Sequence, residues 1–170
     1  MLDETQIYIR MKRWLQDNNW KILGGEPPGG TNDIPLIELK DVSYMKKGSK
    51  GSRKIDFVAY KQGYFLFLEL KPVFSYSDIK KLNEVSGEAK WRVAFIRTLK
   101  ERNIYKELRI STEMETEYTT SDKYYIKAVG FNDTGKLGPQ DFVTFLLSDN
   151  RVKVIIGTKL KSKISQLLSV

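Results

Sequence analysis

Hydrophobic positions in the middle of the chain alternate with a period of two, which is the period of a half-buried strand. The stretch 54–72 reads KIDFVAYKQGYFLFLELKP, and Gln62-Gly63 divides it into two such segments. Glycine supplies the positive φ that a tight hairpin turn needs. The pattern therefore predicts a β-hairpin. In its second strand one face carries Leu66, Leu68 and Leu70, and the other carries Phe65, Phe67, Glu69 and Lys71.

Helical periodicity appears at the two ends of the chain. Asp3 and Gln6 have the spacing of a capping box, and the residues that follow predict a helix to about Asn18. The segment 159–168 predicts a closing helix that is basic on one side. These helices need a sheet to cover, because an amphipathic helix is stabilised mainly by packing its apolar face.

A longer helix is predicted directly after the hairpin, from Ser75 or Ser77 through about Lys100. Gly87 is a weak point or a close-packing point within it. Spacings of three and four define an apolar stripe and a polar side. The stripe contains Ile79, Leu82, Val85, Ala89, Val93 and Ile96, and the polar side contains Lys80, Lys81, Lys90, Arg92 and Arg97.

The remaining segments complete an alternation of helices and strands. A long loop rich in glycine and proline covers 24–35, and the polar stretch 101–121 predicts an irregular excursion or an edge hairpin. The strand predicted at 36–44 and the hairpin form a three-strand meander, which is preceded and followed by a helix. Strands are predicted at 36–44 and 124–131, and further apolar segments lie at 20–23, 142–147 and 152–156.

Length and composition predict one globular domain over residues 1–170, with 41% hydrophobic and 29% charged residues. No apolar run approaches the length of a membrane span. The N-terminus lacks the basic-then-apolar layout of a signal peptide, so we expect a cytoplasmic, or more broadly intracellular, protein.

The chain contains no cysteine and no histidine. This excludes disulfides, zinc fingers, iron–sulfur clusters, thiol nucleophiles and histidine-based triads. An enzyme of this composition must do its acid–base chemistry with carboxylate, lysine, tyrosine or a water activated by a metal. A site of carboxylates and lysine is one of the few that remain.

The net charge of +8 and the pI near 9.5 indicate a polyanionic partner. Part of this charge is concentrated in KKGSKGSRK, residues 46–54, which contains no acid. Such a loop suits phosphate contacts that do not depend on sequence, although a solvated hairpin tip has the same composition. The predicted nucleic-acid-binding residues are Lys46, Lys47, Lys50, Arg53 and Lys54.

Two carboxylates come together if the hairpin pairs in register. Asp56 lies in its first strand, and Glu69 and Lys71 lie near the end of the second. Carboxylates about 4 Å apart repel each other unless a cation lies between them, and Mg²⁺ prefers oxygen ligands. Lys71 then faces one of the waters of the cation or a substrate phosphate, which suits metal-assisted phosphodiester hydrolysis. The alternative is a surface hairpin that ends in an ordinary ion pair.

Asp56, twelve intervening residues and Glu69-Leu70-Lys71 resemble the motif of the PD-(D/E)XK nuclease superfamily, which includes restriction enzymes and Holliday-junction resolvases. Ile55 stands where the signature has proline. The order helix, three-strand meander, helix, strand over residues 3–131 matches the α-β-β-β-α-β core of that superfamily. The resemblance implies an α/β, restriction-endonuclease-like fold, with a mixed sheet flanked by helices and a C-terminal elaboration.

The resemblance also implies an activity, a cofactor and a partner. It implies a nuclease dependent on Mg²⁺ or Mn²⁺, a DNA endonuclease acting on double-stranded or branched DNA, and it is compatible with a homodimer. Asp56, Glu69 and the carbonyl of Leu70 would hold the metal, Lys71 would stabilise charge on the phosphate, and Glu4 on the first helix would complete the site. The alternative on the same fold is a non-catalytic nucleic-acid-binding module or an accessory subunit.

Overall fold

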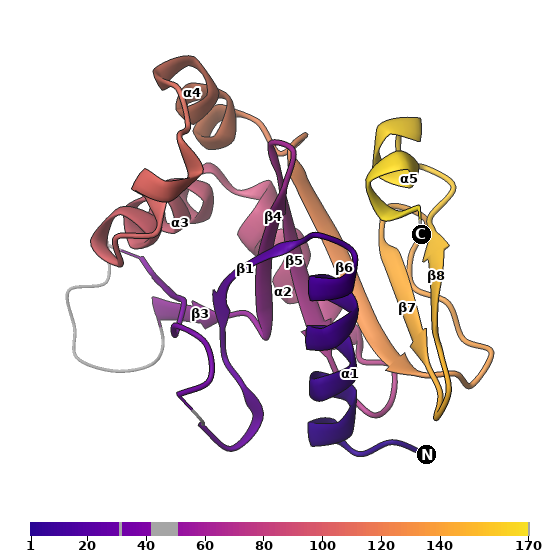
Figure 1. Ribbon diagram of the computed structural model, residues 1–170. Helices are drawn as coiled ribbons and strands as arrows, with labels where there is room; N and C mark the ends of the chain where they lie inside the picture. Colours follow the sequence, from indigo (N-terminus) through magenta and orange to yellow (C-terminus); the bar gives the residue numbers. More distant parts are fainter. Residues whose placement is uncertain (31, 42–50, 170) are drawn as a thin grey trace.

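The computed structural model describes residues 1–30, 32–41 and 51–169, and its centre is a mixed six-stranded sheet (Figure 1). The strand order is β1-β4-β5-β6-β7-β8. The pairs β5–β6 and β6–β7 are parallel and the other pairs are antiparallel, so the predicted α/β class is confirmed. The strands are β1 Lys21–Gly25, β4 Phe57–Lys61, β5 Tyr64–Leu70, β6 Tyr125–Asn132, β7 Val143–Leu147 and β8 Val152–Ile156.

Helices cover both faces of the sheet (Figure 1). The first face is covered by α1 and α5, and the second by α2, α3 and α4, so each face has its own apolar core. No helix in the described part of the chain is long and apolar enough to cross a membrane. The helices are α1 Glu4–Asp17, α2 Tyr76–Gly87, α3 Ala89–Glu101, α4 Thr112–Thr120 and α5 Ser162–Leu168.

The predicted hairpin is confirmed as β4 and β5. Its turn residues Gln62 and Gly63 have φ values of 49° and 86°, the paired positive values of a two-residue hairpin turn. The alternation also holds, because the leucines of β5 pack in the core beneath α1, whereas its phenylalanines pack in the core beneath α2 and α3. The register places Phe57 opposite Leu68, and one step further Asp56 comes opposite Glu69.

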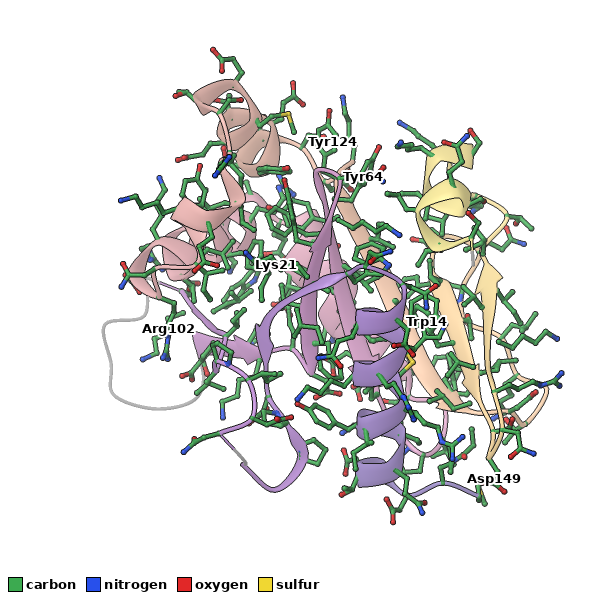
Figure 2. The ribbon with its side chains drawn as sticks, viewed as in Figure 1. Trp14, Lys21, Tyr64, Arg102, Tyr124 and Asp149 are labelled. Carbon is green, nitrogen blue, oxygen red and sulfur yellow. The ribbon has the colours of Figure 1, made fainter. Side chains whose placement is uncertain are left out.

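Aromatic contacts connect elements that are distant in the sequence, and Figure 2 labels Trp14, Tyr64 and Tyr124 among these rings. Trp14 of α1 packs edge-on against Phe145 of β7, with ring centroids 4.9 Å apart. Tyr64 and Tyr124, with centroids 5.4 Å apart, lie at the turn end of the hairpin, far along the strand from Asp56 and Glu69. The first helix also begins as predicted, because the Asp3 side chain accepts from the Gln6 N–H and the Gln6 side chain accepts from the Asp3 N–H.

The prediction that the strand at 36–44 pairs with the hairpin to form a meander is wrong. The strand that pairs with β4 is β1, whereas β2, Glu38–Lys40, pairs with β3, Ser52–Lys54, in a separate two-stranded sheet. Gly25 allows β1 to approach the hairpin closely, because a Cβ at this position would lie 2.1 Å from the carbonyl oxygen of Asp56. The N–H of the next residue, Glu26, bonds to the carbonyls of Ile55 and Asp56. A short segment with two glycines gives little sign of a strand in the sequence, and its partner is distant along the chain.

The single helix predicted through Lys100 is also wrong. Glu88 has φ −94° and ψ 128°, an extended conformation, and this divides the segment into α2 and α3. The break rotates the second half of the apolar stripe, so Val93 is 48% exposed. Arg92, predicted on the polar side, is buried and donates to the carbonyls of Ser86 and Gly87 at 2.9 and 2.7 Å.

The stretch 101–121 is helical, contrary to the expected irregular segment or edge hairpin. It contains the 3-10 helix η3, Tyr105–Leu108, and α4. Ser111 begins α4, because its hydroxyl accepts from the Met114 N–H at 3.2 Å. Glu113 and Glu115 lie in the first turn of α4, where their charge favours the helix dipole.

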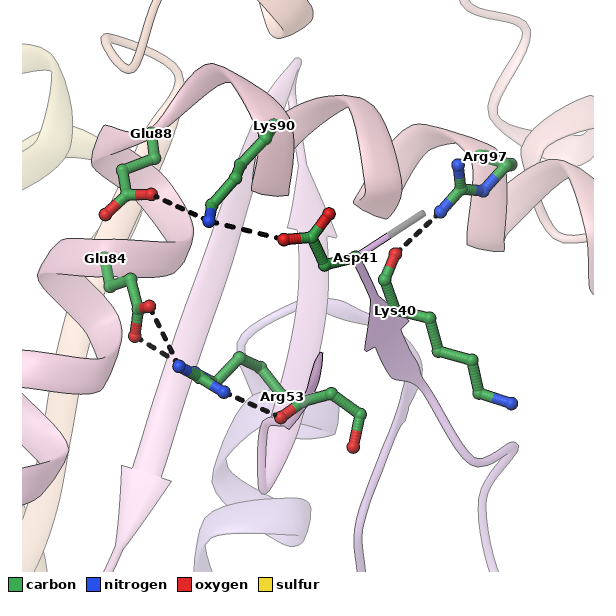
Figure 3. A network of polar contacts seen from close by, with 8 residues as sticks. Lys40, Asp41, Arg53, Glu84, Glu88, Lys90 and Arg97 are labelled. Atoms are coloured by element: carbon green, nitrogen blue, oxygen red, sulfur yellow. Dashed lines mark hydrogen bonds and ion pairs between the residues drawn. The ribbon is translucent and has the colours of Figure 1, made fainter. Parts of the chain in front are cut away.

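Charged side chains of α2 and α3 hold the two-stranded sheet against the main body (Figure 3). Arg53 of β3 donates to both carboxylate oxygens of Glu84, at 3.0 and 2.9 Å. Lys90 lies between Asp41 and Glu88, and Arg97 donates to the carbonyl of Lys40 at 2.7 Å. The small sheet is thus attached through ion pairs as well as through its apolar side chains.

We expect Gly25→Ala to lower the free energy of unfolding by about 2–4 kcal/mol. A Cβ at Gly25 would lie 2.1 Å from the carbonyl oxygen of Asp56, and this backbone contact has no flexible side chain to move away. Urea denaturation measures the change. Gly87→Ala is the control, since its Cβ meets nothing within 4 Å and alanine favours the helix. A Gly25→Ala protein as stable as the wild type would contradict this account of how β1 is seated.

Candidate active site

Two carboxylates lie opposite each other where strand β4 begins and strand β5 ends. Asp56 immediately precedes β4, and its Oδ2 accepts a hydrogen bond from the Leu70 N–H at 2.7 Å. Glu69 lies in β5 and is only 2% exposed. Directly opposed residues of an antiparallel pair project to the same face of the sheet. The hairpin register therefore produces the pair of acids that the sequence predicted.

Burial makes both acids hold their protons more tightly than usual. Burial raises the pKa of Asp56 to about 6, against the opposing effects of the Leu70 N–H and nearby lysines. Burial, and then the charge of Asp56, raise the pKa of Glu69 to about 8. Each carboxylate is thus an unfavourable neighbour for the other, and strongly shifted acids of this kind are typical of functional sites.

Lys71 and Glu4 form an ion pair at the same edge. The Lys71 ammonium lies 3.0 Å from Glu4 Oε1, and both side chains are partly exposed. Burial opposes the charged form of Lys71, but the hydrogen bond to Glu4 and the charge of Asp56 raise its pKa overall. Glu4 reaches this position because the capped first turn of α1 begins beside the end of β5 (Figure 1).

An open pocket of about 270 Å³ connects these groups. Asp56, Lys71, Glu4 and Leu70 line it, together with Tyr8 and the loop 26–30. Glu69 does not line this pocket, because it is enclosed and in contact with Lys81 of α2. The structure thus gathers four of the five predicted catalytic and metal-site residues around one pocket, and encloses the fifth beside it.

Sequence reasoning did not single out Lys81 and Asp78 for this site. The ammonium of Lys81 lies 2.6 Å from Glu69 Oε2 and donates to the Lys54 carbonyl at 3.0 Å. Asp78 is buried in the first turn of α2, and its charge acts on both Asp56 and Glu69. A signal was available for Lys81, since it lies on the predicted helix that follows the motif strand. The sequence did not show which side of that helix faces the sheet.

The predicted nucleic-acid-binding residues have different outcomes. Lys46, Lys47 and Lys50 lie outside the described residues. The guanidinium of Arg53 is held by Glu84 and lies 5.1 Å from the ring centroid of Trp91, so its charge is used within the protein (Figure 3). Lys54 pairs with Glu26, a pocket-lining residue, at 2.8 Å.

The carboxylate oxygens of Asp56 and Glu69 are the kind of ligand that a hard divalent cation prefers. Glu69 Oε1 is buried and has no hydrogen-bond partner among the residues that the structure describes. A cation would satisfy this oxygen and would relieve the repulsion between the two acids. Within the same residues, no three or more Asp or Glu side chains are grouped closely enough to form a complete metal site by themselves. The Leu70 carbonyl and waters are the natural further ligands, since Mg²⁺ keeps several waters.

No family model, no curated protein and no solved structure matches the chain. The interpretation of this site therefore depends on its own geometry and chemistry.

We expect the free energy of unfolding in metal-free buffer to fall as pH rises from about 6 to about 8, by about 1–3 kcal/mol. Glu69 has an ordinary pKa of 4.5 when unfolded and about 8 when folded, so the folded state binds its proton more tightly. The stability that this proton contributes is present below the unfolded pKa and is lost as pH rises through the folded value. Urea denaturation in EDTA at several pH values measures the slope.

The Glu69→Gln variant tests the assignment, because an amide cannot titrate and most of this slope should disappear. Glu84→Gln is the matched control, since pairing with Arg53 lowers the pKa of Glu84 and removes it from this pH range. Equal slopes in the wild type and in Glu69→Gln would show that Glu69 is not the titrating group.

Proposed function

We propose that the protein is a divalent-metal-dependent nuclease that hydrolyses phosphodiester bonds, with DNA as its substrate. The observation that carries the proposal is the enclosed pair Asp56 and Glu69 next to the Lys71–Glu4 ion pair at the rim of an open pocket. Buried acids with raised pKa values lower the stability of the fold, and such an arrangement is expected where chemistry requires it.

The element order supports the nuclease fold. Along the main sheet the chain runs α1, β1, β4, β5, α2 and β6, which is the α-β-β-β-α-β order of the PD-(D/E)XK core that the sequence motif resembles. The two-stranded sheet β2–β3 is inserted between β1 and β4, and α3, η3 and α4 are inserted between α2 and β6. The elements β7, β8 and α5 extend the order at the C-terminal end. Asp56 immediately precedes the second strand of this order, and Glu69 lies in the third.

Each residue has a distinct role in the proposal. Asp56 and Glu69 would hold the cation, with the Leu70 carbonyl as a further oxygen ligand. A hard divalent cation at such a site supplies Lewis-acid stabilisation of the phosphoryl oxygen and lowers the pKa of water. Lys71 places positive charge at the pocket, where it orients the attacking water and stabilises negative charge that develops on the phosphate. Glu4 fixes the Lys71 ammonium through their ion pair.

The net charge of +8 favours a polyanionic substrate, because it attracts phosphates without reference to sequence. Lys71 and Lys54 supply basic side chains at or next to the pocket in the described residues. The pocket is open on its outer side and is shaped by the Pro-Pro-Gly-Gly loop 27–30, so an extended backbone has access to Asp56.

The purified protein should cleave at least one substrate of a panel that contains plasmid, single-stranded DNA, branched DNA and RNA, in Mg²⁺ or Mn²⁺ but not in EDTA. Asp56→Asn and Lys71→Met should each lower the cleavage rate by about 10²–10⁴-fold, because each removes a group that acts on the reacting phosphate or its cation. Gel-based cleavage measures the rates, and fluorescence anisotropy measures binding, which should persist.

Asp122→Asn and Lys136→Met are the matched controls, since both residues are exposed and lie away from the pocket lining. Each makes the same charge change as its site variant and should leave cleavage within about twofold. Nucleic-acid binding by a wild-type protein that cleaves nothing in the panel would reject the nuclease and favour the non-catalytic binding module.

A further inference from the structure

The lysine nearest to Glu69 in the structure is not the lysine of the sequence motif. Lys71 pairs with Glu4, whereas the Lys81 ammonium lies 2.6 Å from Glu69 Oε2. The Glu69 side chain in this pair is 1% exposed and that of Lys81 is 26% exposed. The carboxylate is therefore enclosed, and the partly exposed lysine reaches it from α2.

An enclosed carboxylate next to a second acid needs a positive neighbour to ionise. Lys81 supplies this charge, because its effect opposes both burial and the repulsion from Asp56. Only one oxygen is satisfied in this way, since Glu69 Oε1 has no hydrogen-bond partner within the described ranges. Glu69 therefore has one oxygen held by an internal cation and one buried oxygen without a hydrogen-bond partner among the described residues.

We infer that Lys81 is an internal counter-cation of Glu69, with which a divalent cation must compete for the same carboxylate when the site binds metal. The inference depends on the proposed function for the identity of the cation, but not on any measured cleavage. An ammonium of charge +1 and a cation of charge +2 held by one buried carboxylate repel each other strongly. Lys81 therefore lowers the affinity of the site for metal while it stabilises the metal-free fold.

The surroundings of Lys81 allow this exchange. Its ammonium already donates to the Lys54 carbonyl at 3.0 Å, so it keeps an acceptor when it leaves Glu69. Its partial exposure gives the flexible side chain room to move towards solvent. This acceptor belongs to the last residue of β3, so the displaced ammonium keeps a hydrogen bond beside the site.

Lys81→Met tests the inference through metal affinity. Thermal-melt and calorimetric titrations with MgCl₂ or CaCl₂ should show an apparent Kd about tenfold lower than that of the wild type, because the competing charge is gone. The titrations are made at pH 9, above the pKa of about 8 of Glu69, so that protons compete less for the carboxylate. The melting temperature in EDTA should fall, and the rise on adding metal should be larger than in the wild type.

Lys80→Met is the matched control. Lys80 neighbours Lys81 on α2 and is exposed, so the variant has the same change of net charge without the contact to Glu69. Its metal affinity should stay within about twofold of the wild type. Lys81→Arg keeps the positive charge and should bind metal as weakly as the wild type.

The outcomes separate this inference from the nuclease proposal. Metal binding that is lost in Asp56→Asn but unchanged or weaker in Lys81→Met overturns the role of Lys81 and leaves the nuclease intact. An absence of metal binding in every protein, including the wild type, overturns both. Tighter binding in Lys81→Met and not in Lys80→Met supports the inference even if no substrate of the panel is cleaved.

A double variant covers the case in which Lys81→Met does not fold. Lys81→Met combined with Glu69→Gln removes both charges of the pair, so no uncompensated buried carboxylate remains. It should melt at a higher temperature in EDTA than Lys81→Met does. A double variant no more stable than the single one would show that Lys81 does not act through Glu69.

Discussion

The site of this protein is organised by one unfavourable interaction, the charge repulsion between Asp56 and Glu69 across the hairpin. Two acids opposite each other in an antiparallel pair are destabilising, and enclosure of Glu69 increases the cost. The neighbouring groups offset it in different ways. The Leu70 N–H bonds to Asp56, and Lys81 pairs with Glu69. Their compensation is incomplete, since both acids keep raised pKa values.

Each layer of the fold contributes to this site. The hairpin provides the acids, α1 provides Glu4, and α2 provides Lys81 and the buried Asp78. These elements meet where β4 begins and β5 ends, which is also where α1 and α2 begin (Figure 1). A sheet edge of this kind positions charged side chains rigidly, because the strands and helices that carry them are fixed by two apolar cores.

The site also has two unequal sides. On the side of α1, Asp56 and Lys71 line an open pocket, where a phosphate and water have access. On the side of α2, Glu69 is enclosed and Lys81 balances part of its charge. This asymmetry divides the chemistry into a substrate side and a supporting side. It also explains why the carboxylate with the most strongly raised pKa is the one that solvent does not reach.

The sequence by itself determined the hairpin, the capped first helix and a strand at 124–131, which the structure has at 125–132, because alternation, turn residues and capping are local properties. It also determined that Asp56 and Glu69 face each other, since a two-residue turn sets the register. Tertiary packing decided the rest. It made 21–25 the neighbour of β4, broke the long helix at Glu88, turned Lys81 towards Glu69 and committed Arg53 to Glu84. Those outcomes depend on contacts between residues far apart in the chain, which no local pattern contains.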